Sequence, residues 1–187
     1  MSVLGCLSRA FKARGLEAEF RATGQTGILI AGSGIPIDAV VSDFIAGAAE
    51  MLTPAAGDER WDLVEGQDSI FHPSYAGVSL GLLHGTQPDV IVLCHELGRD
   101  KVVGFDNYLT PSLEEAIDLL LMLARRTNPA VRCAGIALNI AKLDARAAGT
   151  CLGEHAGRLH LPAADQLRPG PELEETVTTC LENEGDK

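Results

Sequence analysis

The sequence predicts an α/β protein whose doubly wound, mostly parallel sheet lies between two layers of helices. Segments with helical periodicity alternate with short apolar segments along the chain, the pattern of three-layer, Rossmann-like folds. Aromatic residues make up only 4% of the 187 residues, so the core must consist mainly of Leu, Val, Ile and Ala. This composition suits parallel strands that helices cover on both faces.

The order of elements follows from changes in hydrophobic period. Residues 2–14 have helical spacing and end at Gly15, whereas residues 16–22 alternate apolar and charged side chains, as a strand does. Residues 23–27 are expected to form a loop, and residues 28–34 receive no assignment. The next segments predict a helix at 36–52, a strand at 63–65, a helix at 75–83 and a strand at 89–94. A loop of about fifteen residues follows, and then a helix whose start is capped by Ser112 and Glu115. The last predicted elements are a strand at 131–139, a weak helix from Asp144 that Gly149 and Gly153 interrupt, an extended piece at 161–165 and a helix at 171–181.

Polar side chains gather where the predicted strands end, and ligands of α/β proteins bind at that edge. The stretch 61–85 follows its short strand with acid, amide, hydroxyl and imidazole groups. The candidate residues there are Glu65, Gly66, Gln67, Ser69, His72 and Ser74. Two other strand ends add the loop Thr23, Gly24, Gln25, Thr26 and Gly27, and His95.

Each candidate has a functional and a structural interpretation. Glu65 is a general base or a Mg²⁺ ligand through water, or else a carboxylate that neighbouring backbone N–H groups hold. His72 orients substrate or moves a proton, or else ties the loop down, and His95 has the same chemistry. Gln25 and Thr26 contact a phosphate or carboxylate, or belong to a tight turn.

Composition disfavours several kinds of partner. The net charge of −11 argues against nucleic-acid binding, which needs clustered Lys and Arg. Five scattered cysteines without a C-x-x-C pair, and no long apolar stretch, predict a cytoplasmic protein without membrane contact. The His and Glu spacings match no transition-metal motif, so no metal ligands are predicted. Cys94 lies in an apolar run, where a thiolate is costly.

The chain begins with a predicted helix, although folds of this kind normally begin with a strand and a phosphate-binding loop. No G-x-x-x-x-G-K-[ST] occurs in the sequence. We therefore expect a domain that lacks its first strand and phosphate loop. The absence of that strand would leave a sheet edge unpaired, and an unpaired apolar edge favours a homo-oligomer.

Three stretches resemble a known family, the D-glutamate N-acetyltransferase-like proteins, long catalogued as a domain of unknown function. They are residues 21–32 (RATGQTGILIAG), residues 65–85 (EGQDSIFHPSYAGVSLGLLHG), and residues 93–96 (LCHE) with 111–115 (PSLEE). The resemblance implies a P-loop NTPase-like domain at residues 1–169, truncated at its amino terminus, and leaves 170–187 as an acidic helical tail. Asp68 and Leu97 stand where the family usually has Gly and Pro.

The resemblance also implies an activity, the transfer of acetyl from acetyl-CoA to the amino group of D-glutamate in D-amino-acid catabolism. Glu65, His72 and His95 are then the expected catalytic residues, and the remaining candidates bind substrate or phosphate. Two alternatives stay open. One is a nucleotide-dependent enzyme that uses ATP and Mg²⁺, and the other is a non-catalytic remnant that is inactive as this truncated chain.

Overall fold

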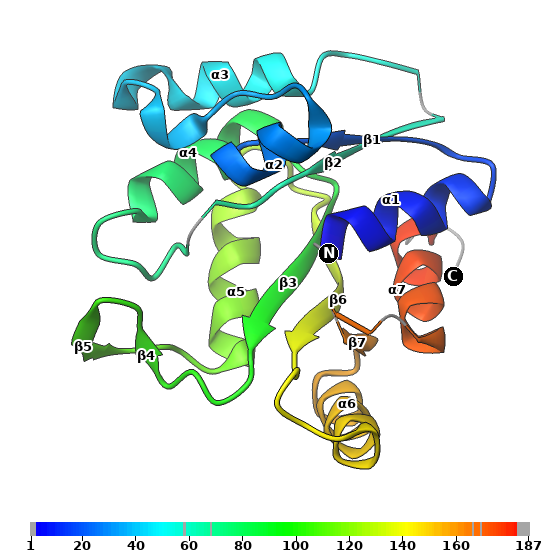
Figure 1. Ribbon diagram of the computed structural model, residues 1–187. Helices are drawn as coiled ribbons and strands as arrows, with labels where there is room; N and C mark the ends of the chain where they lie inside the picture. Colours follow the sequence, from blue (N-terminus) through cyan, green and yellow to red (C-terminus); the bar gives the residue numbers. More distant parts are fainter. Residues whose placement is uncertain (1–2, 58, 68, 166, 169, 183–187) are drawn as a thin grey trace.

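The computed structural model describes residues 3–182 except 58, 68, 166 and 169 (Figure 1). Its elements are α1 (Val3–Ala13), β1 (Glu17–Arg21), α2 (Gln25–Ala31), two 3₁₀ turns (Ile37–Ala39 and Ser42–Phe44), α3 (Ile45–Leu52), β2 (Arg60–Val64), α4 (Ala76–Thr86), β3 (Val90–Glu96), β4 (Lys101–Val102), β5 (Phe105–Leu109), α5 (Leu113–Ala124), β6 (Arg132–Asn139), α6 (Ala145–Leu159), β7 (Ala163–Asp165) and α7 (Pro171–Leu181).

The main strands form two parallel groups. β1 pairs with β2, and β6 lies between β3 and β7. A small antiparallel hairpin, β4–β5, projects from the segment after β3 (Figure 1). The predicted parallel α/β architecture is therefore confirmed, but its sheet is divided between β2 and β3.

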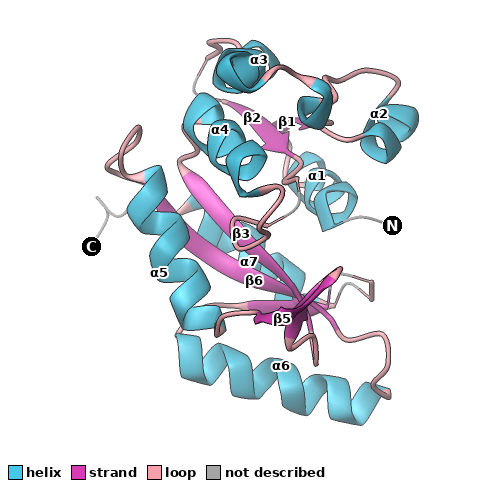
Figure 2. Ribbon diagram, turned by 90° about the vertical axis from the view of Figure 1, so that its left-hand side faces the viewer, coloured by secondary structure: helices cyan, strands magenta, loops and turns pink. Residues whose placement is uncertain are grey.

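Helices cover both faces of the strands, and together they hold the two groups in one body (Figure 2). On one face α1 and α7 pack against side chains from both groups. Phe11 is 1% exposed, and its ring lies 4.9 Å from that of Trp61 on β2. The same cluster includes Val92 of β3 and the fully buried Val177 of α7. On the other face α3 packs against α4, and α4 contacts α5.

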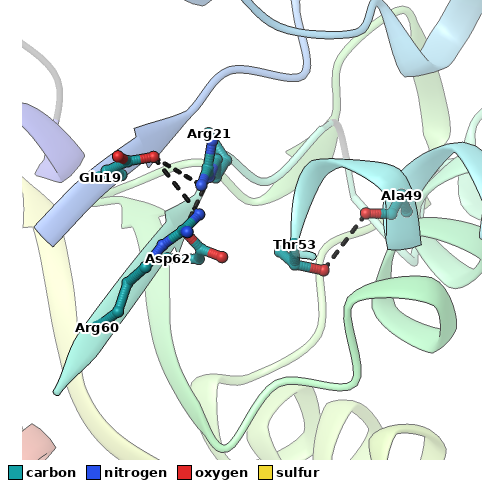
Figure 3. A network of polar contacts seen from close by, with 6 residues as sticks. All are labelled: Glu19, Arg21, Ala49, Thr53, Arg60 and Asp62. Atoms are coloured by element: carbon teal, nitrogen blue, oxygen red, sulfur yellow. Dashed lines mark hydrogen bonds and ion pairs between the residues drawn. The ribbon is translucent and has the colours of Figure 1, made fainter. Parts of the chain in front are cut away.

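The β1–β2 pair has a polar face that ion pairs hold together (Figure 3). Arg21 Nε donates to Asp62 Oδ1 across the strands at 2.8 Å, and Arg60 reaches the same oxygen at 3.1 Å. Arg21 also pairs with Glu19 at 2.6 Å. Because Asp62 is 14% exposed and lies between two guanidinium groups, its charge is matched without a ligand.

The loop predicted at residues 23–27 is wrong from Gln25 onward, because helix α2 (Gln25–Ala31) begins there and continues into the segment that received no assignment. Gly24 is the N-cap in extended conformation, and the helix ends at Gly32, whose φ of 74° lies in the left-handed region. The glycines that suggested a loop thus flank or enter a short helix. The predicted helix at 36–52 is also partly wrong, since two 3₁₀ turns precede α3.

Two other segments are more regular than the sequence suggested. α6 runs without interruption through Gly149 and Gly153, although each glycine costs about 1 kcal/mol relative to Ala. Its N-cap Asp144 accepts from Ala147 N at 2.8 Å, and Leu152 is buried, which together offset that cost. The predicted loop after Glu96 contains the β4–β5 hairpin.

The carboxyl-terminal segment and the α5 cap complete the fold. α7 belongs to the core, since its Val177 and Cys180 are buried against α1 and β6. The predicted capping box of α5 is confirmed, because Ser112 and Glu115 exchange side-chain and backbone hydrogen bonds. Within residues 3–182, as far as they are described, no helix is long and apolar enough to cross a membrane.

Candidate functional site

The carboxyl ends of β1 and β2 are joined by a compact polar cluster around Thr23 and Glu65. The fully buried Thr23 donates its hydroxyl to the Glu65 carbonyl at 2.7 Å. The backbone N–H groups of Thr23 and Gly24 both donate to Glu65 Oε2, each at 3.2 Å. The Glu65 carboxylate therefore lies against the first turn of α2, where backbone N–H groups favour a negative charge.

Close packing explains two of the glycines in this cluster. A Cβ on Gly27 would lie 2.1 Å from Glu65 Oε2, and one on Gly24 would lie 2.1 Å from Gln67 Nε2. Gln67 Nε2 donates to Thr23 Oγ1 at 3.2 Å, and Ser79 Oγ donates to the Gln67 carbonyl at 2.8 Å. Protein side chains thus fill the space that these glycines leave.

The other candidates near this cluster face solvent. Gln25 and Thr26 are exposed in the first turn of α2, and Gly66 is exposed with open space around it. Their predicted ligand contacts stay predictions. Asp68, the departure from the family pattern, lies outside the described residues.

His72 joins its loop to the β4–β5 hairpin. Its Nε2 lies 3.2 Å from the Val103 carbonyl, and its Nδ1 accepts from Ser74 N at 3.2 Å. The ring packs edge-on against Phe105, with centroids 5.1 Å apart. Ser69 Oγ accepts from Phe71 N within the same loop at 3.2 Å. Both ring nitrogens are therefore engaged within the protein, and the catalytic role predicted for His72 stays a prediction.

His95 is the candidate best placed to accept a proton. Partial burial lowers the pKa of its imidazole, and the nearby His155 and Arg99 lower it further, against the opposing charge of Glu96. Glu96 is itself paired with Arg99, and with Lys142 at 3.5 Å. Arg99 is the main cause of the lowered pKa of Glu96. At neutral pH, the imidazole of His95 is therefore uncharged, and the negative charge of the neighbouring Glu96 is balanced by Arg99 and Lys142.

An open cavity of about 560 Å³ lies between Leu97, in the segment after β3, and α6, and His95 itself is not among the residues that line it. Leu97 and Leu143 line one part, and Arg146, Cys151 and His155 line the α6 side. The sequence did not identify these α6 residues as candidates. The spacing of Cys151 and His155, one helical turn apart on a helix that follows a strand end, was the available signal.

The Cys151–His155 pair is not arranged as a nucleophile and base. His155 Nδ1 lies 2.8 Å from the Cys151 carbonyl, closer than its 3.6 Å to the thiol sulfur. Burial and the charge of Glu154 raise the pKa of Cys151. Desolvation by the surrounding protein likewise raises the pKa of the Cys94 thiol to about 11, although part of this side chain is exposed to solvent, so neither thiol is ionised appreciably at neutral pH.

The structure thus places the predicted site residues in three groups along the carboxyl edge. Thr23, Glu65 and Gln67 form one, His72 and the hairpin a second, and His95 with the α6 cavity a third. Among the described residues, no hydrogen bond or ion pair joins one group to another. The same part of the chain contains no group of three or more His, Cys, Asp or Glu side chains placed to hold a metal ion.

Parallel strands between two helical layers define a doubly wound α/β domain, the class in which ligands bind at the carboxyl edge of the sheet. Comparison with known proteins narrows this class. The chain belongs to the DUF1611 family. Residues 1–173 match the family's carboxyl-terminal P-loop domain, which is described as a domain of unknown function.

Curated relatives and a solved structure agree with this family. The chain is 51% identical over 159 residues to a D-glutamate N-acetyltransferase of Tritonibacter scottomollicae, covering 85% of this chain and 48% of that protein. It is 45% identical over 164 residues to one from a Pseudoalteromonas species, covering 88% and 49%. The crystal structure of a DUF1611 family protein from Anabaena variabilis superposes with a TM-score of 0.87 at 34% identity, covering 94% of this chain and 52% of that one. The chain therefore spans about half the length of the proteins it matches.

Proposed function

We propose that this chain is the P-loop-type half of an enzyme that acetylates the amino group of D-glutamate. The observation that carries the proposal is the 51% identity to a D-glutamate N-acetyltransferase over 159 residues. Because the chain spans 48% of that relative, the proposal assigns it part of the active site and not the whole. Acetyl-CoA is the proposed acetyl donor, and the cytoplasm, where that thioester is available, is the proposed compartment.

His95 is the proposed general base. The ammonium of D-glutamate must lose a proton before its nitrogen attacks the thioester carbonyl. An imidazole with a lowered pKa is free to take that proton near neutral pH. The carbon–nitrogen bond then forms and the carbon–sulfur bond breaks, and the leaving thiolate takes up the second proton, which the attacking nitrogen releases as it becomes an amide.

Glu65 and the cavity have supporting roles in this proposal. The Glu65 carboxylate already accepts two backbone N–H groups, so it positions the start of α2 and does not act as base. The cavity of about 560 Å³ is open to solvent and has room for a small substrate. Arg146 brings a cation to its wall for a substrate carboxylate, and Glu154 brings an anion for the ammonium.

The test is an assay of thiol release from acetyl-CoA, with D-glutamate or L-glutamate as acceptor. The chain is assayed alone and together with the unmatched half of the Tritonibacter protein. We expect release that depends on D-glutamate in the complemented sample, and a loss of about 10²–10⁴-fold in His95→Asn. His160→Asn, which removes an exposed imidazole after α6, is the matched control and should retain activity.

Two results would count against the proposal. A folded, complemented chain that releases no thiol would favour a non-catalytic role. Release that requires ATP and Mg²⁺ would favour the nucleotide-dependent alternative, which the P-loop description of the family supports.

A further inference from the structure

The imidazole of His155, on α6, has one nitrogen held by the backbone. Its Nδ1 lies 2.8 Å from the Cys151 carbonyl oxygen, one helical turn earlier. A carbonyl oxygen only accepts hydrogen bonds, so a separation this short requires a proton on Nδ1. The neutral ring is therefore the Nδ1–H tautomer, and its Nε2 carries a lone pair. Among the described residues, no hydrogen bond reaches that Nε2.

This ring lines the open cavity of about 560 Å³ between α6 and the segment after β3. Nε2 lies farther from the main chain than Nδ1 does in any histidine, so the unengaged nitrogen is at the outer end of the side chain. His95 is not among the residues that line the cavity. Within the part of the chain that the structure describes, His155 is thus the imidazole that a molecule in this cavity would meet.

The residues on either side of His155 fix which end of a substrate would reach it. This step rests on the proposed function, in which Arg146 binds a substrate carboxylate and Glu154 binds the ammonium. Glu154 follows Arg146 by about two turns of α6, about 12 Å along the axis, and the flexible Arg146 side chain shortens that distance. Glu154 directly precedes His155, and both line the cavity. The nitrogen of the substrate would therefore lie at the level of His155.

Acetyl transfer to an ammonium group requires its nitrogen to lose two protons. The first leaves before attack, to His95 in the proposed function, and the open cavity allows His95 to release it to water. The second leaves as the nitrogen becomes an amide, and the departing sulfur must gain a proton. Because His95 does not line the cavity, a different group has to move this second proton.

We propose that His155 carries the second proton from the attacking nitrogen to the leaving sulfur. Its Nε2 lone pair accepts the N–H proton as the carbon–nitrogen bond forms. The resulting imidazolium gives that proton to the sulfur as the carbon–sulfur bond breaks, so a neutral thiol leaves and the ring returns to its starting form. The Cys151 carbonyl holds the ring through Nδ1–H in both states. His155 is thus a catalytic residue that acts first as base and then as acid.

The charges around the two imidazoles fit this division of roles. A positive charge on His155 lowers the pKa of His95, so His95 stays neutral while His155 holds a proton. Arg99 lowers the pKa of His95 in the same way. The carboxylate of Glu154, which lines the same cavity, favours the imidazolium form of its neighbour during the transfer.

Nitrogen-15 NMR of the histidine side chains tests the tautomer on the chain alone, without any measurement of activity. The His155 signals are assigned by their loss in His155→Gln. At neutral pH we expect the chemical shift of a proton-bearing nitrogen at Nδ1 and that of a lone-pair nitrogen at Nε2. The opposite tautomer would overturn the inference, because Nε2 would then have no lone pair to accept a proton.

Chemical rescue tests the proton transfer itself. In the assay with the unmatched half of the Tritonibacter protein, His155→Ala should lower kcat with acetyl-CoA by about 10²-fold, and KM for D-glutamate should change much less. Added imidazole should restore part of kcat, because the cavity is open to solvent. Pyrazole, a ring of the same size but a far weaker base, should not. His160→Ala removes an exposed imidazole and should need no rescue.

The outcomes separate this inference from the proposed function. If the wild-type chain releases no thiol, the proposed function has failed, and the NMR measurement still decides whether Nε2 is free to accept a proton. If the wild-type chain is active and His155→Ala equals it, the inference alone is overturned. It is also overturned if imidazole fails to restore kcat, or if imidazole and pyrazole restore kcat equally, because the ring would then only fill space.

Discussion

Thr23 and Glu65 hold the ends of β1 and β2 together through both backbone and side chain. The Thr23 hydroxyl donates to the Glu65 carbonyl at 2.7 Å, and Thr23 N donates to the Glu65 carboxylate at 3.2 Å. Thr23 is fully buried, so water cannot replace either bond. This pair determines where α2 begins and what its first turn faces.

Replacement of Thr23 should lower the stability of the protein in a way that depends on the hydroxyl. Thr23→Val keeps the shape but leaves the Glu65 carbonyl and the Gln67 amide without their partner. We expect a loss of about 1–3 kcal/mol in the free energy of unfolding, measured by urea denaturation. Thr23→Ser retains the hydroxyl and should lose less. Equal losses in the two variants would show that the methyl group matters and the hydrogen bonds do not.

Gly27→Ala should destabilise the protein, because the new Cβ would clash with the Glu65 carboxylate. The new Cβ would displace the Glu65 carboxylate, which lies 2.1 Å from its position, and so break the bonds from Thr23 and Gly24 N–H. Loss of these charge-assisted bonds costs about 1.5–3 kcal/mol, more than the gain of up to about 1 kcal/mol in helix propensity.

A double-mutant cycle in urea isolates this contact. In a Glu65→Ala background, Gly27→Ala should become neutral or stabilising. Gly153→Ala on α6, where a Cβ meets open space, is the matched control and should stabilise the protein by about 1 kcal/mol in either background. Destabilisation by Gly27→Ala that persists without the Glu65 side chain would mean that the backbone of α2 is the cause.

His95 should make stability depend on pH below neutrality. Its pKa in the folded protein lies below its usual value of 6.5, so the unfolded chain binds more protons in this range. The stabilising contribution is therefore complete above pH 6.5 and is lost as the pH falls toward the lowered pKa. An NMR titration of the imidazole checks the direction of the shift directly.

Replacement of the neighbouring His155 tests why the pKa of His95 is lowered. His155→Gln removes a positive charge that lowers the pKa of His95, so the titration midpoint should rise, while burial still keeps it below 6.5. A midpoint that stays unchanged in His155→Gln would assign the shift to burial and Arg99 alone.

The sequence by itself determined the order and type of most elements. Alternation of apolar and charged residues predicted the strand at 16–22, and apolar runs predicted those at 89–94 and 131–139. The Ser112–Glu115 spacing predicted a cap. These signals depend on neighbours within a few residues. The sequence also identified Glu65 and His95 as strand-end groups. Local periodicity failed at the start of α2, where the carboxylate of Glu65, distant in sequence, accepts the N–H groups of Thr23 and Gly24.

Only the tertiary structure decided which groups surround each candidate residue. Whether a carboxylate or imidazole is free depends on the hydrogen-bond donors and charges that distant segments bring to it. Thr23 and Gly24 therefore engage Glu65, and the hairpin carbonyl of Val103 engages His72. The charge of His155, on α6, lowers the pKa of His95, and other residues of α6 line the cavity. Pairing between strands is likewise a long-range property, which is why the division of the sheet between β2 and β3 appears only in three dimensions.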